Sequence, residues 1–244
     1  ILNGYNFAKH LFDVNAELKT DTESGSLIIS LSTLGDGEIY YTTDGSVPSV
    51  KSNKYETPVQ IKTDTHFQAR VIRSSGESRV YEEKIYFSKG TMKPIVLTEE
   101  PSKGYSFNGA PVLNDGIKGN GNYKTGRWLG FQGKDIVATF DLKEATEISK
   151  IRFATNVVKG DWIMDARQVY VSVSDDGKTF REVGKEELPE MQMADKDGLF
   201  VHEIDFTSVK AKYVQVTIKK VNLPSWHGGA GNPAFIFVDE IEIL

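Results

Sequence analysis

"LNDGIKGNGNYKTGRWLGFQGKDIVATFDL", residues 113–142, joins a glycine-rich loop, a tryptophan and a stretch of alternating residues. In residues 135–142 apolar and polar side chains alternate, which is typical of a β-strand with one buried face. The glycines ahead of it let the backbone turn and pass close to other groups. Trp128 leads directly into the strand, so we expect its side chain in the core. The stretch predicts a sheet protein in which a long loop precedes a core strand.

Short alternating runs of the same kind recur on both sides of this stretch. Each is rich in β-branched or aromatic residues and is bounded by Gly, Asp, Ser or Pro, which is the usual strand signal. The runs cover residues 26–32, 38–44, 66–73, 79–87, 135–142, 148–156, 167–174, 199–206, 212–220 and 233–244. No segment of helical length carries a 3.6-residue apolar stripe with caps at both ends. The sequence therefore predicts an all-β protein.

A joint near residue 90 divides the chain. "SKGTMKP" (88–94) contains glycine and proline without an apolar period. A chain of 244 residues is long enough for two ordinary domains. We therefore predict one domain over 1–90 and a second over 91–244. The opening "ILNGYNFAKHLFDV" (1–14) reads as mid-chain sequence, so we expect the chain to be part of a longer protein.

Composition excludes several classes of function. The net charge is −5 with the signs interspersed, which lacks the basic surface of a nucleic-acid binder. No window reaches the roughly 20 apolar residues of a membrane-spanning helix. The absence of cysteine excludes disulfides, thiolate catalysis and cysteine-ligated zinc. A hydrolase barrel of alternating strands and helices would need recurrent amphipathic helices, which are missing here.

The first half contains a specific turn-rich motif. In "YYTTDGSVPS" (40–49), Asp44-Gly45 provides a tight turn and Pro48 stiffens the next one. The motif resembles the "Y-T-x-D-G-x-x-P" signature of the immunoglobulin-like domain that follows the catalytic barrel in chitobiase and β-hexosaminidase enzymes of glycoside hydrolase family 20. The resemblance implies an immunoglobulin-like β-sandwich that acts as a spacer and has no catalytic residue.

Three motifs of the second half occur in a characteristic order. After residues 113–142 come "VYVSVSDDGKTFREV" (169–183), a strand pair around an Asp-Gly turn, and the closing "FVDEIEIL" (237–244). Together they resemble the discoidin domain, also called the coagulation factor type C fold, which in bacteria serves as carbohydrate-binding module family 32. The resemblance implies a jelly-roll β-sandwich of eight strands. The tandem of both domains resembles the C-terminal end of exported bacterial family 20 β-N-acetylhexosaminidases.

The adjacent acids Asp239 and Glu240 invite a catalytic interpretation, because family 20 enzymes use neighbouring Asp and Glu residues. Successive residues of a strand point to opposite faces, however, and we expect "IEIL" (241–244) to continue the strand. The two carboxylates would then not converge on one glycosidic oxygen. We predict no catalytic residue in this chain.

The resemblance to discoidin domains implies instead a structural calcium ion. There a Glu of the last strand and the Asp of an earlier "DG" loop hold the ion, and this chain offers Glu240 and Asp115 at matching places. Calcium takes six to eight oxygens, which loop carbonyls can complete. The loop lacks the usual second acidic residue, so two alternatives stay open: Glu240 is solvated, or it pairs with an arginine such as Arg127.

Sugar recognition needs an aromatic plate beside a few fixed polar groups. Trp226 and His227 lie in a glycine-rich loop, and Trp162 follows Gly160-Asp161. The predicted carbohydrate-binding residues are Trp226, His227, Trp162, Asp161 and Arg167. The alternative is that these tryptophans serve domain packing.

Other polar features have simpler interpretations. His10 and His66 are expected to be satisfied side chains at a domain surface. "SDDGKT" (174–179) reads as a hairpin turn and not as a calcium loop, because it lacks a distal Glu. Residues 185–197, "KEELPEMQMADKD", are expected to form a solvated charged loop.

The sequence thus predicts a non-catalytic accessory region of an exported β-N-acetylhexosaminidase-like enzyme, located in the periplasm, on the outer surface or outside the cell. Its partners would be the parent catalytic domain and a glycan with terminal galactose or N-acetylhexosamine, bound weakly through the second domain. One alternative is a purely structural pair of domains that stabilises or shapes the parent enzyme. Another is a module for adhesion to a protein or a surface.

Overall fold

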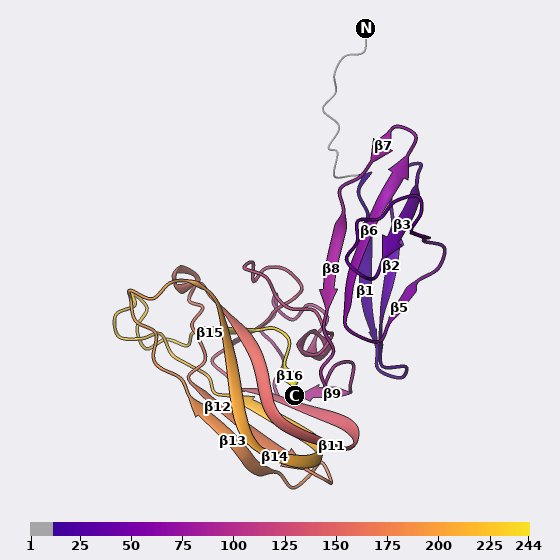
Figure 1. Ribbon diagram of the computed structural model, residues 1–244. Coiled ribbons are helices and arrows are strands. Elements are labelled where there is room, and N and C mark those ends of the chain that lie inside the picture. The colour runs from indigo at the N-terminus through magenta and orange to yellow at the C-terminus, as the bar shows by residue number, and fades with distance from the viewer. Residues whose placement is uncertain (1–11) are drawn as a thin grey trace. The chain divides into compact units, whose positions relative to one another are not determined.

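The computed structural model describes residues 12–244 (Figure 1), so His10 lies outside the described residues. Strands make up 50% and helices 3% of the structure, which confirms the all-β prediction. The chain divides into two compact units, with the boundary between Tyr86 and Phe87. Among the described residues no helix has the length and apolarity needed to cross a membrane.

The first unit consists of two antiparallel sheets. One sheet has the order β1-β2-β5, and the other has the order β4-β3-β6-β7 with β8 paired to β6. The strands are β1 (Asn15–Asp21), β2 (Ser26–Ser32), β3 (Glu38–Thr42), β4 (Asn53–Lys54), β5 (Val59–Ile61), β6 (Thr65–Arg73), β7 (Gly76–Glu77) and β8 (Tyr81–Ile85).

Alternation along the central strands gives each sheet of the first unit an apolar face. The buried residues are Leu27, Ile29 and Leu31 on β2 and Phe67, Ala69 and Val71 on β6. The hydroxyl of Tyr55, which follows β4, accepts a hydrogen bond from the backbone N–H of Leu31 at 3.0 Å and so links the two sheets. As predicted, His66 is satisfied near the surface, with Nε2 2.7 Å from Glu82 Oε1.

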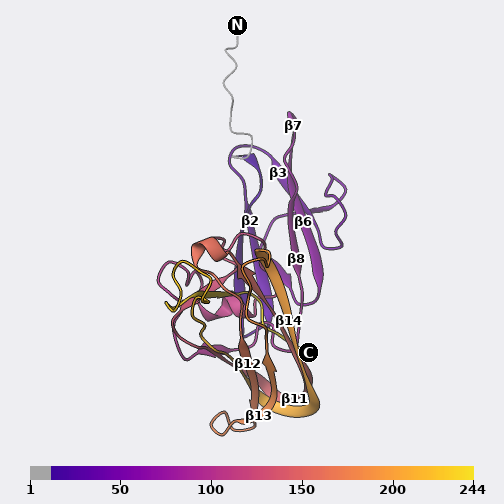
Figure 2. The same cartoon turned by 90° about the vertical axis from the view of Figure 1, so that its left-hand side faces the viewer.

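The second unit is built on one eight-stranded sheet (Figures 1 and 2). Its strand order is β10-β15-β11-β14-β12-β13, and β9 and β16 both pair with β11. The strands are β9 (Ile95–Leu97), β10 (Leu129–Gln132), β11 (Ile136–Val157), β12 (Gln168–Ser174), β13 (Arg181–Glu187), β14 (Gly198–Ile218), β15 (Phe235–Val238) and β16 (Glu242–Ile243). Two short 3₁₀ helices, η2 (Ala110–Leu113) and η3 (Lys159–Asp161), lie in the loops.

Two very long strands let this sheet fold over itself. The runs predicted at 135–142 and 148–156 are parts of one strand, β11, and those at 199–206 and 212–220 are parts of β14. The pairing of β11 with β14 shifts register between Asp141 and Thr146, and Lys143 adopts a positive φ of 73° there. Bulges of this kind bend a strand and increase its twist. Each long strand therefore serves both layers of the jelly roll, and this half of the predicted fold class is confirmed.

Trp128 is fully buried, as predicted, with a relative exposure of 0%. Its indole N–H donates to the carbonyl of Asn120 at 3.0 Å. The ring packs so closely on Gly119 that a Cβ there would lie 2.3 Å from two of its carbons. Trp128 thus anchors the glycine-rich loop to the core.

Residues 174–179 form the predicted turn between β12 and β13, where Asp176 accepts the backbone N–H groups of Lys178 and Thr179 at 2.8 Å.

Both ends of the second unit meet beside β11. Lys89 N–H donates to Ile243 C=O at 2.9 Å, and Ser149 N–H donates to Leu244 C=O at 2.8 Å. Asn114 Nδ2 donates to the carbonyls of Gly90 and Lys93, both at 2.8 Å. The segment that opens the unit is therefore bound to the segment that closes it.

Candidate functional site

The backbone around Asp239 and Glu240 differs from the prediction. β15 ends at Val238 and β16 begins only at Glu242. The break arises because Ile241 N–H leaves the ladder and donates to the carbonyl of Leu113 at 2.7 Å. The prediction of a continuous strand is therefore wrong, although the two carboxylates do contact different groups.

Asp239 binds two backbone segments. Its Oδ1 accepts the N–H of Ala154 on β11 and its Oδ2 accepts the N–H of Gly119, both at 2.9 Å. The side chain is buried, and burial raises the pKa of its carboxyl group from 3.8 to about 7. Asp239 therefore attaches the loop that contains Gly119 to the sheet, and both of its oxygens already accept hydrogen bonds.

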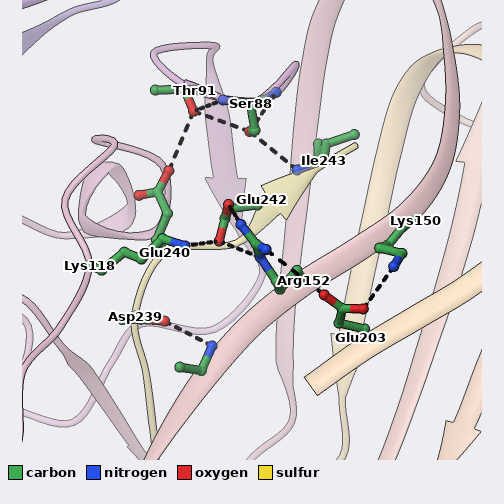
Figure 3. A network of polar contacts seen from close by, with 12 residues as sticks. Ser88, Thr91, Lys118, Lys150, Arg152, Glu203, Asp239, Glu240, Glu242 and Ile243 are labelled. Carbon is green, nitrogen blue, oxygen red and sulfur yellow. Dashed lines mark hydrogen bonds and ion pairs between the residues drawn. The ribbon is translucent and has the colours of Figure 1, made fainter. Parts of the chain in front are cut away.

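Glu240 faces a different loop. Its Oε2 accepts the N–H of Gly116 at 3.0 Å, and Oε1 lies 3.5 Å from the hydroxyl of Thr91 (Figure 3). Its exposure is 1%, so the alternative of a solvated Glu240 is wrong. Burial raises the pKa of Glu240 well above its ordinary value, and the negative charge of Asp115 raises it further. The structure thus brings Asp115 and Glu240 into electrostatic contact.

Glu242 is the acid of this segment that has cationic partners (Figure 3). Arg152 binds it through Nε at 2.9 Å and through a second, shorter contact from Nη2, and Lys118 Nζ lies 2.8 Å away. Burial alone would raise the pKa of Glu242, but the bonds from Arg152 and Lys118 outweigh it and lower the pKa. Arg152 and Lys118 thus compensate the charge of Glu242.

The oxygen donors around Glu240 fit a hard cation in part. The carboxylate of Glu240 is buried, that of Asp115 is partly buried, and the charge of Asp115 disfavours ionisation of Glu240. Within residues 12–244 no group of three or more His, Cys, Asp or Glu side chains is suited to a metal ion. Calcium accepts backbone carbonyls as ligands, so a site here would have to be completed by the loop backbone.

A second candidate site surrounds Trp162, which follows η3. This residue adopts a left-handed conformation, with φ 65° and ψ 24°, that is uncommon for a bulky side chain. Its N–H donates to Lys159 C=O at 3.1 Å, and its C=O accepts from Phe235 N–H at 2.8 Å. A Cβ at residue 229 would lie 2.9 Å from the Trp162 ring, so only glycine leaves room for it. These contacts hold the indole at the surface, where 39% of the residue is exposed.

Asp161, the residue before Trp162, has a fixed carboxylate. Tyr123 donates its hydroxyl proton to Asp161 Oδ2 at 2.6 Å. Burial, and then the bond to Asp161, raise the pKa of Tyr123 to about 12, so the phenol stays a donor at neutral pH. Two consecutive residues therefore supply a held acceptor and an exposed aromatic plate, the two kinds of group that sugar recognition requires.

Trp226 and His227 lie on a second glycine-rich loop, residues 224–232, and the His227 ring contacts both Trp162 and Trp226. The centroid of the His227 ring lies 6.1 Å from that of Trp162 and 5.8 Å from that of Trp226. His227 Nδ1 accepts from Gly229 N–H, and Nε2 lies 3.0 Å from Lys159 C=O, which assigns the proton to Nε2. Trp226 donates its indole N–H to Met191 C=O at 2.9 Å. We call Asp161, Trp162, Trp226 and His227 the Trp162 surface.

Comparison with known proteins settles the family. The model of the F5/8 type C domain matches residues 99–235, more than half of the chain. The chain belongs to the F5/8 type C family. Residues 29–85 in the first unit match a second family model, described as Fn3 associated. A search among curated proteins gave no match.

Solved structures similar to the F5/8 type C unit have low sequence identity to this chain. Chitosan-binding module 1 from a chitosanase/glucanase of Paenibacillus sp. IK-5 is 15% identical, with 65% of this chain and 99% of that chain covered and a TM-score of 0.42. CpGH89CBM32-5 of Clostridium perfringens, in complex with GalNAc-β-1,3-galactose, is 19% identical, with 62% and 94% covered and a TM-score of 0.41. The lectin domain of lectinolysin, complexed with Lewis B antigen, is 16% identical, with 65% and 96% covered and a TM-score of 0.43.

Arg167 takes a different direction from the other predicted sugar-binding residues. Its Nε donates to Leu188 C=O at 3.0 Å, and Nη1 lies 3.1 Å from Glu190 Oε1. It lines an open depression of about 650 Å³, together with Pro224 and Ser225. The F5/8 type C unit thus gathers four of the five predicted residues in the Trp162 surface and directs Arg167 to a separate hollow.

Sequence reasoning missed three features of the F5/8 type C unit. Tyr123 gave no signal, because its partner Asp161 lies 38 residues away. Lys159 gave no signal either, because its partners lie 34 and 36 residues away. The prediction of a solvated loop over 185–197 is wrong in part, because residues 185–187 belong to β13 and Met191 is buried. The signal available was the pair of methionines at 191 and 193, which are unusual in a purely solvated loop.

Proposed function

We propose that the F5/8 type C unit binds a neutral glycan, with terminal galactose or N-acetylhexosamine, on the Trp162 surface. The observation that carries the proposal is the exposed indole of Trp162, held in a left-handed conformation directly after Asp161, whose carboxylate is bonded to Tyr123. The C–H face of a pyranose would stack on the indole, and Asp161 would accept its hydroxyl protons. Tyr123 and Gly229 would keep both groups in place.

Binding at this surface is expected to be weak. An open surface buries little of a ligand, and bonds to sugar hydroxyls replace good bonds to water. We expect a Kd of about 1 mM for a monosaccharide, which corresponds to about 4 kcal/mol. Tethering to a catalytic domain would compensate by raising the effective concentration of the glycan.

Titration calorimetry of the whole chain with galactose and N-acetylglucosamine tests the proposal, after a glycan array has shown which sugars to include. Trp162→Ala should weaken binding at least tenfold, about 1.4 kcal/mol. Tyr86→Ala is the matched control, since Tyr86 is an aromatic of similar exposure, 40%, in the other unit.

Binding that survives Trp162→Ala would contradict the proposed site. The absence of binding to any arrayed sugar would favour the purely structural role, and capture of a protein or surface ligand would favour adhesion.

We also propose that calcium binds between Asp115 and Glu240. The repulsion of buried Glu240 by the charge of Asp115 supports this, because a cation would remove it. A bound calcium ion would cross-link the Asp115 loop to the C-terminal segment. Thermal melting with calcium and with chelator tests the site, because a ligand that binds only the folded state raises the midpoint. Equal midpoints at pH 8 would overturn it.

We propose, finally, that the chain is a non-catalytic part of an exported bacterial β-N-acetylhexosaminidase-like glycoside hydrolase, with the first unit as spacer. The "YYTTDGSVPS" motif (40–49) and the order of the two units support this parentage. The sequence encoded immediately before Ile1 provides the test. A family 20 catalytic barrel there would support the proposal, and a different enzyme or an adhesin would refute it. Turnover of a chromogenic hexosaminide by this chain alone would show that the fragment itself is catalytic.

A further inference from the structure

The ammonium group of Lys159 is directed inward, although the residue lies in a surface turn. Its Nζ donates to Met193 C=O at 3.0 Å and to Asp195 C=O at a shorter distance, and it lies 3.8 Å from Asp197 Oδ1. Only 18% of the side chain is exposed. An ammonium has three N–H donors, and three oxygens of a single segment, 193–197, surround this one.

Trp226 holds the same segment from a second position. Its indole N–H donates to Met191 C=O at 2.9 Å. The Lys159 Nζ lies 6.0 Å from the centroid of the Trp226 ring, within the range of a cation–π contact. Residues 191–197 are thus fixed at one end by an indole and further along by an ammonium, and the two holding groups contact each other.

The backbone of Lys159 is joined to the Trp162 surface as well. Its carbonyl accepts the N–H of Trp162 at 3.1 Å and lies 3.0 Å from His227 Nε2. Its own N–H donates to Asp197 Oδ1 at 3.3 Å. One residue therefore connects the turn that carries Trp162, the loop that carries His227, and segment 191–197.

We propose that Lys159 is a positioning residue that fixes segment 191–197 against Trp226 and makes this segment a wall of the glycan site. The assignment of the segment to a glycan site rests on the proposed function, but the ordering of the segment by Lys159 does not. Because the ammonium of Lys159 is bound to oxygens of segment 193–197, it orders the site and does not attract ligand. The segment then determines how far a glycan can extend past Trp162 on that side.

Hydrogen exchange of the full chain without sugar tests the positioning role. Lys159→Met keeps the length and apolar stem of the side chain and removes the charge, and it should speed amide exchange in residues 191–197 at least tenfold. Lys159→Arg should restore most of the protection, because a guanidinium can still donate to several oxygens. Lys196→Met is the matched control, since Lys196 is an exposed lysine of the same segment. Equal exchange in Lys159→Met and Lys196→Met would overturn the proposal.

Titration with galactose and N-acetylglucosamine then tests the role of the segment as a wall. Lys159→Met should weaken the binding found for the unmodified chain at least fivefold, with rescue by Lys159→Arg. Lys178→Met, at an exposed lysine of the turn between β12 and β13, should leave binding unchanged. A segment that loosens while sugar affinity stays the same would overturn the wall but leave the glycan site intact. If even the unmodified chain binds no sugar, the proposed function fails, and hydrogen exchange alone decides whether Lys159 orders the segment.

Discussion

Burial has different electrostatic consequences for the acidic residues near the chain end, because their partners differ. Glu242 has Arg152 and Lys118 as partners, and its pKa is lowered. Glu240 has the negative Asp115 as a neighbour, and its pKa is raised. A buried carboxylate without a compensating charge destabilises the fold once it ionises. Glu240 is therefore a residue at which pH and calcium should both act.

Glu240→Gln should change the pH dependence of stability. The pKa values of Asp239 and Glu240 are raised in the folded state, so their stabilising contribution is complete below the unfolded values near 4 and is lost as pH rises through the folded values, about 7 for Asp239. In chelator, stability should fall between pH 5 and pH 7 by up to about 1.4 kcal/mol per pH unit and carboxyl group. Glu240→Gln removes one of these groups, so the slope should be shallower.

The sign of the Glu240→Gln effect should depend on calcium. At pH 8 in chelator the variant should melt above the unmodified chain, because no buried charge remains at this position. In millimolar calcium it should melt below, because a ligand oxygen is lost. Melting curves in both buffers provide the check. An effect of the same sign in both would refute calcium binding at Glu240.

Gly119→Ala should destabilise the second unit. Its Cβ would lie 2.3 Å from the buried ring of Trp128, and overpacking of this kind costs about 1–3 kcal/mol. Gly121→Ala, in the same loop but with open space around its Cβ position, should have little effect. Denaturant titration measures both. Equal stability of the two variants would contradict the packing of the loop on Trp128.

At the scale of elements, the bends of β11 and β14 shape the jelly roll. Each of these strands runs through both layers, and the change of direction coincides with the register shift between Asp141 and Thr146. Lys143 has a positive φ there, and its N–H donates to Asp141 Oδ1 at 2.8 Å. A non-glycine residue in this conformation is strained, so position 143 stores some unfavourable energy.

Lys143→Gly should stabilise the protein slightly. Relief of the left-handed strain is worth about 1–2 kcal/mol, and the added flexibility of the unfolded chain offsets about 0.5–1 kcal/mol of it. We expect a net gain of up to about 1.5 kcal/mol, measured by chemical denaturation. Lys210→Gly, in β14, should instead lower stability, because glycine weakens a strand without relieving strain. A loss of stability in Lys143→Gly would argue against the bend at this position.

The sequence was informative where the signal is local. Alternation along 135–142 and 212–220 predicts strands correctly, and the Asp-Gly turn at 174–179 predicts a hairpin. The merging of neighbouring runs into β11 and β14 depends on pairing between residues 41 to 82 positions apart, which no local pattern encodes.

Prediction of the site was limited as well, because its contacts join residues that are far apart in the sequence. The exposed Trp162 could be singled out from its loop context, whereas its supports come from Gly229 and Lys159 and depend on how the loops are closed. Arg167 was chosen for its position near Trp162 in the sequence, but its guanidinium is bound to Glu190 and Leu188. Proximity along a loop does not determine the direction in which a long side chain points.

At the scale of the whole molecule, the opening segment of the second unit is part of its structure and not a free linker. Met92 is buried, with 1% exposure, and its N–H donates to Asn114 C=O at 2.9 Å. Ser88 Oγ accepts from Ile243 N–H at 3.2 Å. The unit therefore begins at Phe87, and residues 88–93 close it together with the C-terminal segment.

Truncation tests this boundary. A fragment of residues 87–244 should melt close to the second unit of the full chain. A fragment of residues 94–244 should be less stable by at least about 3 kcal/mol, from the lost burial of Met92 and several hydrogen bonds of about 1 kcal/mol each. Calorimetry measures both. Equal stability of the two fragments would show that residues 88–93 are only a linker.

The most direct test of glycan binding observes the three tryptophan indole N–H signals by NMR during a titration of the full chain with galactose and N-acetylglucosamine. Trp128 is buried and bonded to Asn120, so its signal provides an internal reference, and Trp162→Phe assigns the signal of Trp162. We predict that the Trp162 signal shifts progressively with sugar while that of Trp128 stays in place. A titration in which the Trp162 signal does not move, although an arrayed glycan binds the chain, would contradict the assignment of the site.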